Sequence, residues 1–168
     1  LAAALKDPDP NLRIAALRLA REQKQDVIPL VKSLAADPDA GVRREAVLAL
    51  RHQRAPEAAS LWAEFARQHD GRDRWYLEAL GIAADGQWDA FLAAWLQAAG
   101  AQWNTPAGRD IVWRSRAKQT PDLLVKIVTD GSNPPSDAGR YLRAFDFLSG
   151  PEKDAALQKI LAAATPGK

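Results

Sequence analysis

The chain of 168 residues contains no cysteine. Disulfide bonds, thiolate metal sites and cysteine nucleophiles are therefore excluded, although this absence does not identify a cellular compartment. Histidine is also scarce, because the chain has only His52 and His69, 17 residues apart and each at a predicted helix end. A metal site needs three or four converging ligands. We therefore expect both histidines to be exposed and no metal to be bound.

Sequence motifs of catalysis are missing as well. The chain has no glycine-rich phosphate loop, no Gly-x-Ser-x-Gly elbow and no helical His-Glu-x-x-His motif. Its six serines are scattered without a convincing base partner. We expect a protein that is not an enzyme and that needs no cofactor.

An excess of one charge is nearly absent. The 23 basic and 21 acidic residues give a net charge of +2, and the two sides of residue 71 are equally balanced. Nucleic-acid binding usually needs a broader basic field, so it is disfavoured. The longest uncharged run, residues 90–108, is broken by glycine and proline in its second half. Its apolar part is too short to cross a bilayer, and we expect no membrane span.

Helix-forming residues, in contrast, are plentiful. Hydrophobic residues make up 47% of the chain, with much alanine and leucine, and β-branched residues are sparse outside short clusters such as 127–129. These preferences predict an all-α fold. The stretch DPDPNLRIAALRLA begins at Asp7, and DPDAGVRREAVLAL begins 30 residues later at Asp37. Such spacing indicates internal repeats.

Each repeat has the pattern of two helices. Asp9 followed by Pro10 is typical of a helix start, because aspartate caps the first turn and proline fits the first helical position. One hairpin cannot bury both of its apolar faces, whereas stacked hairpins can. We expect residues 1–168 to form a single domain, and its opening LAAALK, which resembles the tail of a helix, suggests a piece of a larger protein. The predicted hairpins span residues 9–36, 39–68, 72–99, 105–130 and 136–163.

The pattern Asp-Pro-Asp followed by Val/Leu-Arg-x-x-Ala resembles the HEAT repeat family. This resemblance implies a right-handed α-solenoid of about five HEAT-like hairpins. It also implies that Arg13 and Arg43 stack along the array and bind neighbouring aspartates, and that Arg74 continues the row. The loops that contain Asp9 and Asp39 lack the glycine and the glutamate of a calcium-binding loop. We therefore interpret both aspartates as helix caps within this inter-repeat ladder.

The middle of the chain carries a second, narrower resemblance. Three stretches within residues 70–150 resemble a segment of large multidomain haem-binding proteins of planctomycete and verrucomicrobial bacteria: GRDRWYLEALGIAADGQWDAFLAAWL, WNTPAGRDIVWRSRA and RYLRAFDFLSG. In those proteins a dehydrogenase-like β-propeller precedes HEAT-like repeats, and a c-type cytochrome domain with Cys-x-x-Cys-His follows. This chain has no cysteine, so it lacks the haem attachment motif. The resemblance implies a spacer between such domains, in a periplasmic or other extracytoplasmic location.

Tryptophan is unusually frequent, with five of six residues between positions 75 and 113. Trp88, Phe91 and Trp95 share one helical face with Leu92, which indicates burial in the core. Trp103 lies in a stretch bounded by glycine and proline, and it is the tryptophan that we expect to be exposed.

Arg109, Trp113 and Arg116 follow i, i+4, i+7 spacing and can share a helix face. With Trp103 they form our candidate interaction surface. The preferred hypothesis is a non-catalytic protein-interaction scaffold or interdomain spacer, monomeric as an isolated domain, that binds a protein or neighbouring domains of the same polypeptide. Three alternatives remain open: a solvated face with a stacked Arg–Trp pair, a carbohydrate site on exposed tryptophan, and a DNA-binding surface. The last is suggested by HEAT-like DNA glycosylases, which place Trp, Asp and Arg on a concave basic surface.

Overall fold

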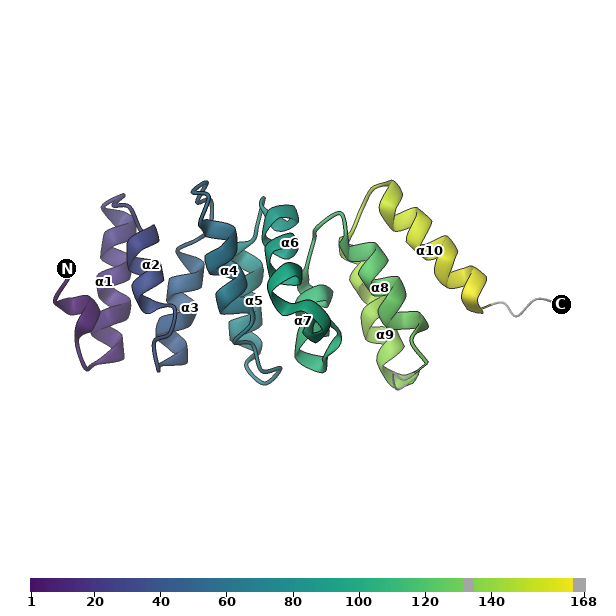
Figure 1. The fold of residues 1–168 in the computed structure, drawn as a ribbon, viewed down its shortest axis with the longest axis horizontal. Helices are drawn as coiled ribbons and strands as arrows, with labels where there is room; N and C mark the ends of the chain where they lie inside the picture. The colour runs from purple at the N-terminus through teal and green to yellow at the C-terminus, as the bar shows by residue number, and fades with distance from the viewer. Residues whose placement is uncertain (132–134, 165–168) are drawn as a thin grey trace. The chain divides into compact units, whose positions relative to one another are not determined.

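The computed structural model describes residues 1–131 and 135–164, and this part of the chain is entirely helical, which confirms the predicted all-α class (Figure 1). Each expected hairpin contains two α-helices. The α-helices are α1 (Pro10–Glu22), α2 (Ile28–Leu34), α3 (Ala40–Leu48), α4 (Ala58–Ala66), α5 (Arg74–Ala83), α6 (Trp88–Ala99), α7 (Pro106–Arg114), α8 (Thr120–Thr129), α9 (Pro135–Arg143) and α10 (Pro151–Ala164). Three short 3₁₀ turns accompany them: η1 (Ala4–Lys6), η2 (Gly100–Asn104) and η3 (Ala144–Phe147).

One feature differs from the sequence-based expectation. The opening LAAALK forms the single turn η1 rather than the end of an α-helix. The contacts within the chain divide it into two compact units, unit 1 from Leu1 to Gly100 and unit 2 from Ala101 onward. Gly100 ends α6 with φ of 51° and ψ of −130°, a backbone conformation that residues with a Cβ rarely adopt.

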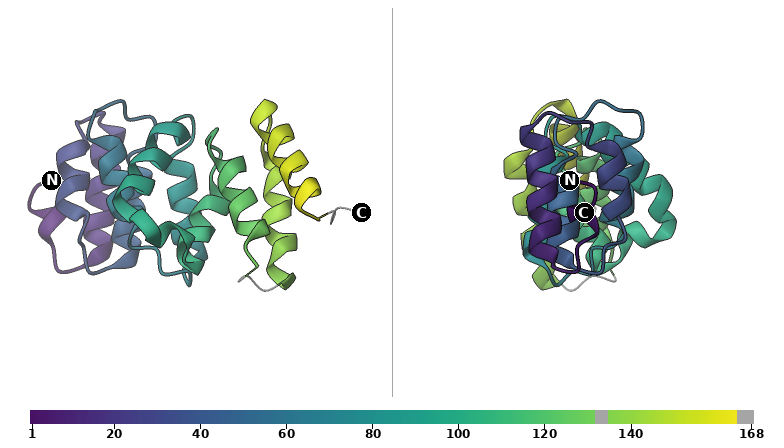
Figure 2. Two further views of the ribbon diagram at one scale, coloured as in Figure 1. Left: turned by 45° about the vertical axis from the view of Figure 1, so that its right-hand side comes forward. Right: turned by 90° about the vertical axis from the view of Figure 1, so that its left-hand side faces the viewer.

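Unit 1 consists of three hairpins stacked in two layers. Helices α1, α3 and α5 pack in one layer, and α2, α4 and α6 pack in the other (Figure 1 and Figure 2). Each helix of the first layer begins at an aspartate cap: the Asp9, Asp39 and Asp73 side chains accept hydrogen bonds from backbone amides in the first turn of α1, α3 and α5. This two-layer stacking is that of an α-solenoid.

The core of unit 1 is aromatic where α4 meets α6. Trp62 is fully buried, and its ring centroid lies 5.9 Å from that of Trp88 and 5.6 Å from that of Phe91. Its indole Nε1 donates to the Leu80 carbonyl of α5 at 3.0 Å, so this side chain ties both layers together. Trp95 is also buried, and the predicted core face of α6 therefore lies in the core.

Unit 2 contains the remaining two hairpins. Helix α8 packs against α7, α9 and α10, and it contributes the fully buried Leu124 and Ile127. The turn from α7 to α8 is held by Ser115 and Thr120, whose buried hydroxyl oxygens lie 2.7 Å apart. Each hydroxyl therefore has a polar partner inside the unit.

The start of α7 depends on a close backbone approach at Gly108. A Cβ at this position would lie 2.4 Å from the Trp103 carbonyl oxygen, whereas a Cβ at Gly139 in α9 would meet no atom within 4 Å. We expect Gly108→Ala to lower the free energy of unfolding by about 1–3 kcal/mol, since backbone must move to admit the methyl group.

Gly139→Ala is the matched control, because it adds the same methyl group inside a helix of the same unit. It should leave the free energy of unfolding unchanged or raise it by up to about 1 kcal/mol. Urea denaturation followed by circular dichroism measures both. Equal effects of the two substitutions would contradict the assigned packing of η2 against α7.

Candidate interaction surface

The first and second hairpins are joined by an ion pair between Arg13 and Asp37. Arg13 Nε donates to Asp37 Oδ2 at 2.8 Å, and Nη2 donates to Oδ1 at 2.9 Å. The side chains are only 10% and 7% exposed. The third nitrogen, Nη1, donates to the backbone carbonyls of Asp7 and Pro8. Hydrogen bonding to Asp37 raises the pKa of Arg13 above its ordinary value.

The corresponding arginine of the second hairpin has a different environment. Arg43 Nη1 donates to the Asp37 and Pro38 carbonyls, as Arg13 does one repeat earlier, but its guanidinium lies over the Tyr76 ring, 5.9 Å from the centroid. Its buried Nε has no hydrogen-bond partner among the described residues. Asp70 bonds its own loop, through the amide of Arg72.

A one-residue insertion accounts for this change. Asp37 stands two residues before its helix cap, Asp39, whereas Asp70 stands three residues before its cap, Asp73. Gly71, with φ of 80°, takes up the extra residue in a left-handed conformation. The bond to the next hairpin is made by Arg44 instead, which donates to the Asp73 carboxylate at 3.3 Å.

Arg74, predicted to continue the row, has a different register. It is the first residue of α5, directly after the cap Asp73, whereas Arg13 and Arg43 stand four residues after theirs. Its Nε donates to Glu78 at 2.7 Å within the same helix. By the position of the caps, Leu77 is the residue of α5 that corresponds to Arg43.

A second inter-hairpin contact was missed by the sequence analysis. Glu45 of α3 is buried and accepts hydrogen bonds from both Arg18 and Arg21 of α1, at 2.7–3.0 Å. Arg51 reaches Asp85 of the following hairpin at 2.9 Å. These pairs join residues 24–34 positions apart, and a single sequence gives no signal as to which distant acid faces which arginine.

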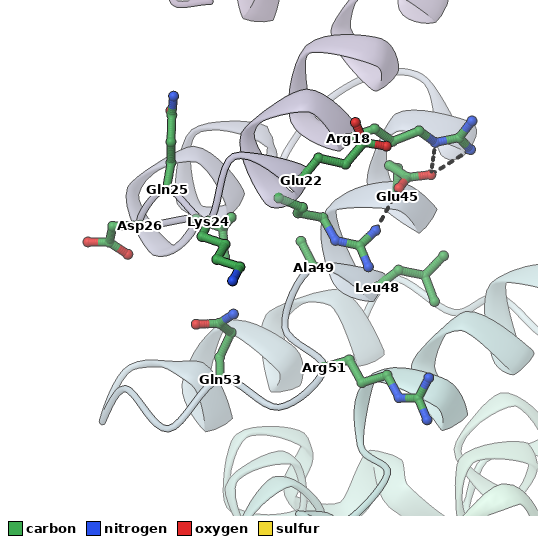
Figure 3. Close-up of a pocket in the computed structure, with 12 residues that line it drawn as sticks. Arg18, Glu22, Lys24, Gln25, Asp26, Glu45, Leu48, Ala49, Arg51 and Gln53 are labelled. Carbon is green, nitrogen blue, oxygen red and sulfur yellow. Dashed lines mark hydrogen bonds and ion pairs between the residues drawn. The ribbon is translucent and has the colours of Figure 1, made fainter.

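Glu45, its two arginine partners and Arg51 line part of a surface cleft of about 1020 Å³ in unit 1 (Figure 3). Figure 3 shows Glu45 bonded to Arg18, with Lys24 and Arg51 nearby. The lining carries both signs of charge and lies near the ends of α1 and α3. Helix C-termini disfavour anions, so the cleft has no marked preference for phosphate.

The predicted surface residues of unit 2 lie around α7. Trp103 is half-buried in η2, and its backbone packs against Gly108. Arg109 Nε donates to the Asn104 side chain at 2.9 Å, and its Nη2 lies 3.9 Å from Asp130. The Arg109 side chain is only 14% exposed. Both of its partners flank its own hairpin, since Asn104 is the last residue of η2 and Asp130 is the C-cap of α8.

Trp113 and Arg116 also have internal partners. The Arg140 guanidinium of α9 lies 4.9 Å from the Trp113 ring and binds Asp110 at 2.6 Å, which joins the two hairpins of unit 2. Arg116 Nη1 donates to three carbonyls at the end of α7, and its guanidinium lies over the Phe147 ring. Trp113 and Arg116 therefore both contact other residues of unit 2.

The most exposed tryptophan is one that the sequence analysis did not single out. Trp75 of α5 is 73% exposed, whereas Trp103, expected to be exposed, is half-buried. Ile82, one i+7 step along the same helix, is 41% exposed and can share the face of Trp75. The sequence signal was present, because Trp75 lies outside the apolar face that carries Tyr76, Leu77 and Leu80.

The histidines differ from each other. His52 is exposed, as expected, but His69 is buried and stacks on Tyr76 with 6.4 Å between ring centroids. Within the described residues no cluster of three or more metal-ligating side chains occurs. The same part of the chain has no helix both long and apolar enough to span a membrane.

Tyr76 gives the structure a measurable pH dependence. Burial raises its pKa to about 12, and its hydroxyl donates to the Phe65 carbonyl at 3.1 Å. An unfolded tyrosine ionises near pH 10. The stability that un-ionised Tyr76 contributes is therefore fully present below about pH 10 and is lost as the pH rises towards 12.

Absorbance titration of the two tyrosines, Tyr76 and Tyr141, tests this expectation. We expect Tyr76 to ionise only near pH 12, together with loss of helical circular dichroism. Tyr76→Phe should remove this step, and Tyr141→Phe should retain it. Ionisation of Tyr76 near pH 10 in the folded chain would contradict its assigned burial.

Comparison with known proteins agrees with the geometry of unit 1. Residues 1–81 match the family of HEAT repeats, and the match ends within α5. No curated protein and no solved structure matches the chain. The matched segment contains the two hairpins with the Asp-Pro-Asp caps and the arginine–aspartate bond. Residues 1–81 are therefore similar to HEAT repeats, in agreement with the α-solenoid stacking of unit 1.

Proposed function

We propose that this protein is a non-catalytic protein-interaction scaffold and that the exposed face of α5 is part of its binding surface. The observation that carries the proposal is the 73% exposure of Trp75, while Trp62, Trp88 and Trp95 are buried. Tryptophan is enriched among the residues that dominate binding energy at protein interfaces. Helical repeats offer extended surfaces for such partners.

The charges around this face favour a protein partner over a nucleic acid. Arg44 binds Asp73, Arg74 binds Glu78, and Arg51, in the turn after α3, binds Asp85. Paired in this way, the cations do not form the broad basic field that neutralises a phosphate backbone. Trp75 and Ile82 thus lie on a helix face with balanced charge, which suits the apolar centre of a protein interface.

The alternative DNA-binding surface of Trp103, Arg109, Trp113 and Arg116 is less well supported. Arg109 and Arg116 would have to exchange partners within unit 2 for a phosphate, at the cost of the contacts that now hold their loops. Trp103 and Trp113 are half-buried, and we propose that they give secondary contacts to a protein partner.

We also propose the more specific role of an interdomain spacer in a larger, haem-binding and dehydrogenase-like bacterial protein. It rests on the resemblance of residues 70–150 alone. Sequencing the complete gene tests it: a propeller-encoding region and a Cys-x-x-Cys-His motif in the same reading frame would support the role. A complete gene without them would contradict it.

Photo-crosslinking from position 82, on the same helix face as Trp75, tests the scaffold proposal. A photoreactive amino acid at position 82 leaves Trp75 in place and should capture a partner protein, whose affinity for the purified chain is then measured by titration calorimetry. We expect Trp75→Ala to weaken binding by about 30-fold, since an interface tryptophan commonly contributes 2 kcal/mol or more.

Leu161→Ala is the matched control, because Leu161 is 67% exposed on α10 of unit 2. It should leave the affinity for the partner protein unchanged.

Fluorescence anisotropy with duplex DNA at low salt tests the alternative of a DNA-binding surface. Salt-sensitive DNA binding that Arg116→Ala weakens, or partner binding that does not respond to Trp75→Ala, would contradict the proposal.

A further inference from the structure

Helix α3 has a stripe of side chains that is buried against the preceding hairpin. The stripe consists of Val42, Glu45 and the C-cap residue Ala49, which follow i, i+3, i+7 spacing and are all buried. Its direction is fixed by Glu45, which binds Arg18 and Arg21 of α1. This stripe, together with the Asp37 carboxylate, is the surface by which the second hairpin receives the first.

The same stripe on α1 is open. A shift of 30 residues places Leu12, Ala15 and Leu19 at the three corresponding positions, and all are exposed. Leu12 is 48% exposed and Leu19 is 46% exposed. The turn η1 packs on α1, and its Leu5 is buried, yet the stripe remains uncovered. The right-hand view of Figure 2 faces this end of unit 1, with α1 in front.

The polar part of the surface is also repeated on α1. Asp7 corresponds to Asp37, and in both the Oδ1 atom accepts a hydrogen bond from the amide two residues on, at 2.9 Å. The backbone carbonyl of each accepts from the arginine of its own hairpin, Arg13 at 2.7 Å and Arg43 at 2.6 Å. The Asp7 carboxylate therefore has the conformation of Asp37, but no described arginine side chain binds it.

We propose that Asp7, Leu12, Ala15 and Leu19 form a docking surface for an arginine-bearing helical hairpin of the same kind as α1–α2. The occupant is defined by its complementarity to this surface: its arginine binds Asp7 as Arg13 binds Asp37, and its apolar helix face covers Leu12 and Leu19. This surface continues the interface between the first two hairpins. It is separate from Trp75, so the proposal does not depend on the function proposed above.

Tandem duplication of residues 7–36 within the full chain tests the surface. The added copy precedes the original one in the chain. Its Arg13 would then face Asp7 of the original copy, as Arg13 faces Asp37 in the natural chain. We expect the Tm to rise by several degrees, because each further hairpin adds a nearest-neighbour interface. We also expect slower hydrogen exchange of the α1 amides that the added copy covers.

A double-mutant cycle in the duplicated chain isolates the polar contact. Arg13→Ala in the added copy and Asp7→Asn in the acceptor should each lose part of the gain in Tm, and the pair together should lose little more than either alone. Asp7→Asn in the unduplicated chain is the control. It retains an Oδ1 acceptor and should change the Tm less, because no arginine is present there to lose.

Three results would overturn the proposal. The first is a duplicated chain whose Tm and α1 exchange do not change. The second is a cycle in which the two losses simply add. The third is a concentration-dependent dimer of the unduplicated chain that Leu19→Glu dissociates, since a second copy would then be the occupant.

Discussion

The contact between Arg13 and Asp37 is the interaction on which the order of the first two hairpins depends. It joins two hairpins through two parallel hydrogen bonds, and it also ties the arginine to the loop that precedes its own helix. A planar guanidinium with all three nitrogens engaged fixes both distance and orientation. The apolar residues of adjacent helices can then pack in one register, since a slip along the helix axis would break the pair.

The loss of this contact one repeat later shows how strongly it depends on loop length. A single additional residue, Gly71, separates the acid from its cap, and Arg43 lies over Tyr76 instead of binding a carboxylate. The stacking of unit 1 continues, because Arg44 binds Asp73 and Trp62 of α4 bonds to α5. Aromatic packing thus takes over much of the role that the ion pair has between the first two hairpins.

Much of the fold could be predicted from the sequence, and the reasons are local. Aspartate caps, proline at first helical positions and the internal repeat predict five hairpins, and two α-helices of the described chain correspond to each predicted range. The burial of His69 and the partners of Glu45 could not be predicted in the same way. Each depends on which neighbouring hairpin covers a given helix face, and that is decided by loop geometry in three dimensions rather than by periodicity. The boundary at Gly100 is a further example, since helical periodicity carries no information on how contacts divide between units.

A double-mutant cycle on Arg13 and Asp37 in the natural chain tests the central claim most directly. The stabilities of Arg13→Ala, Asp37→Ala and the double variant would be compared by urea denaturation. Since each residue loses its main partner when the other is replaced, we expect each single change to be strongly destabilising and the double variant to be little worse than either. Simple additivity of the two losses would show that the pair does not couple the hairpins and would contradict this account.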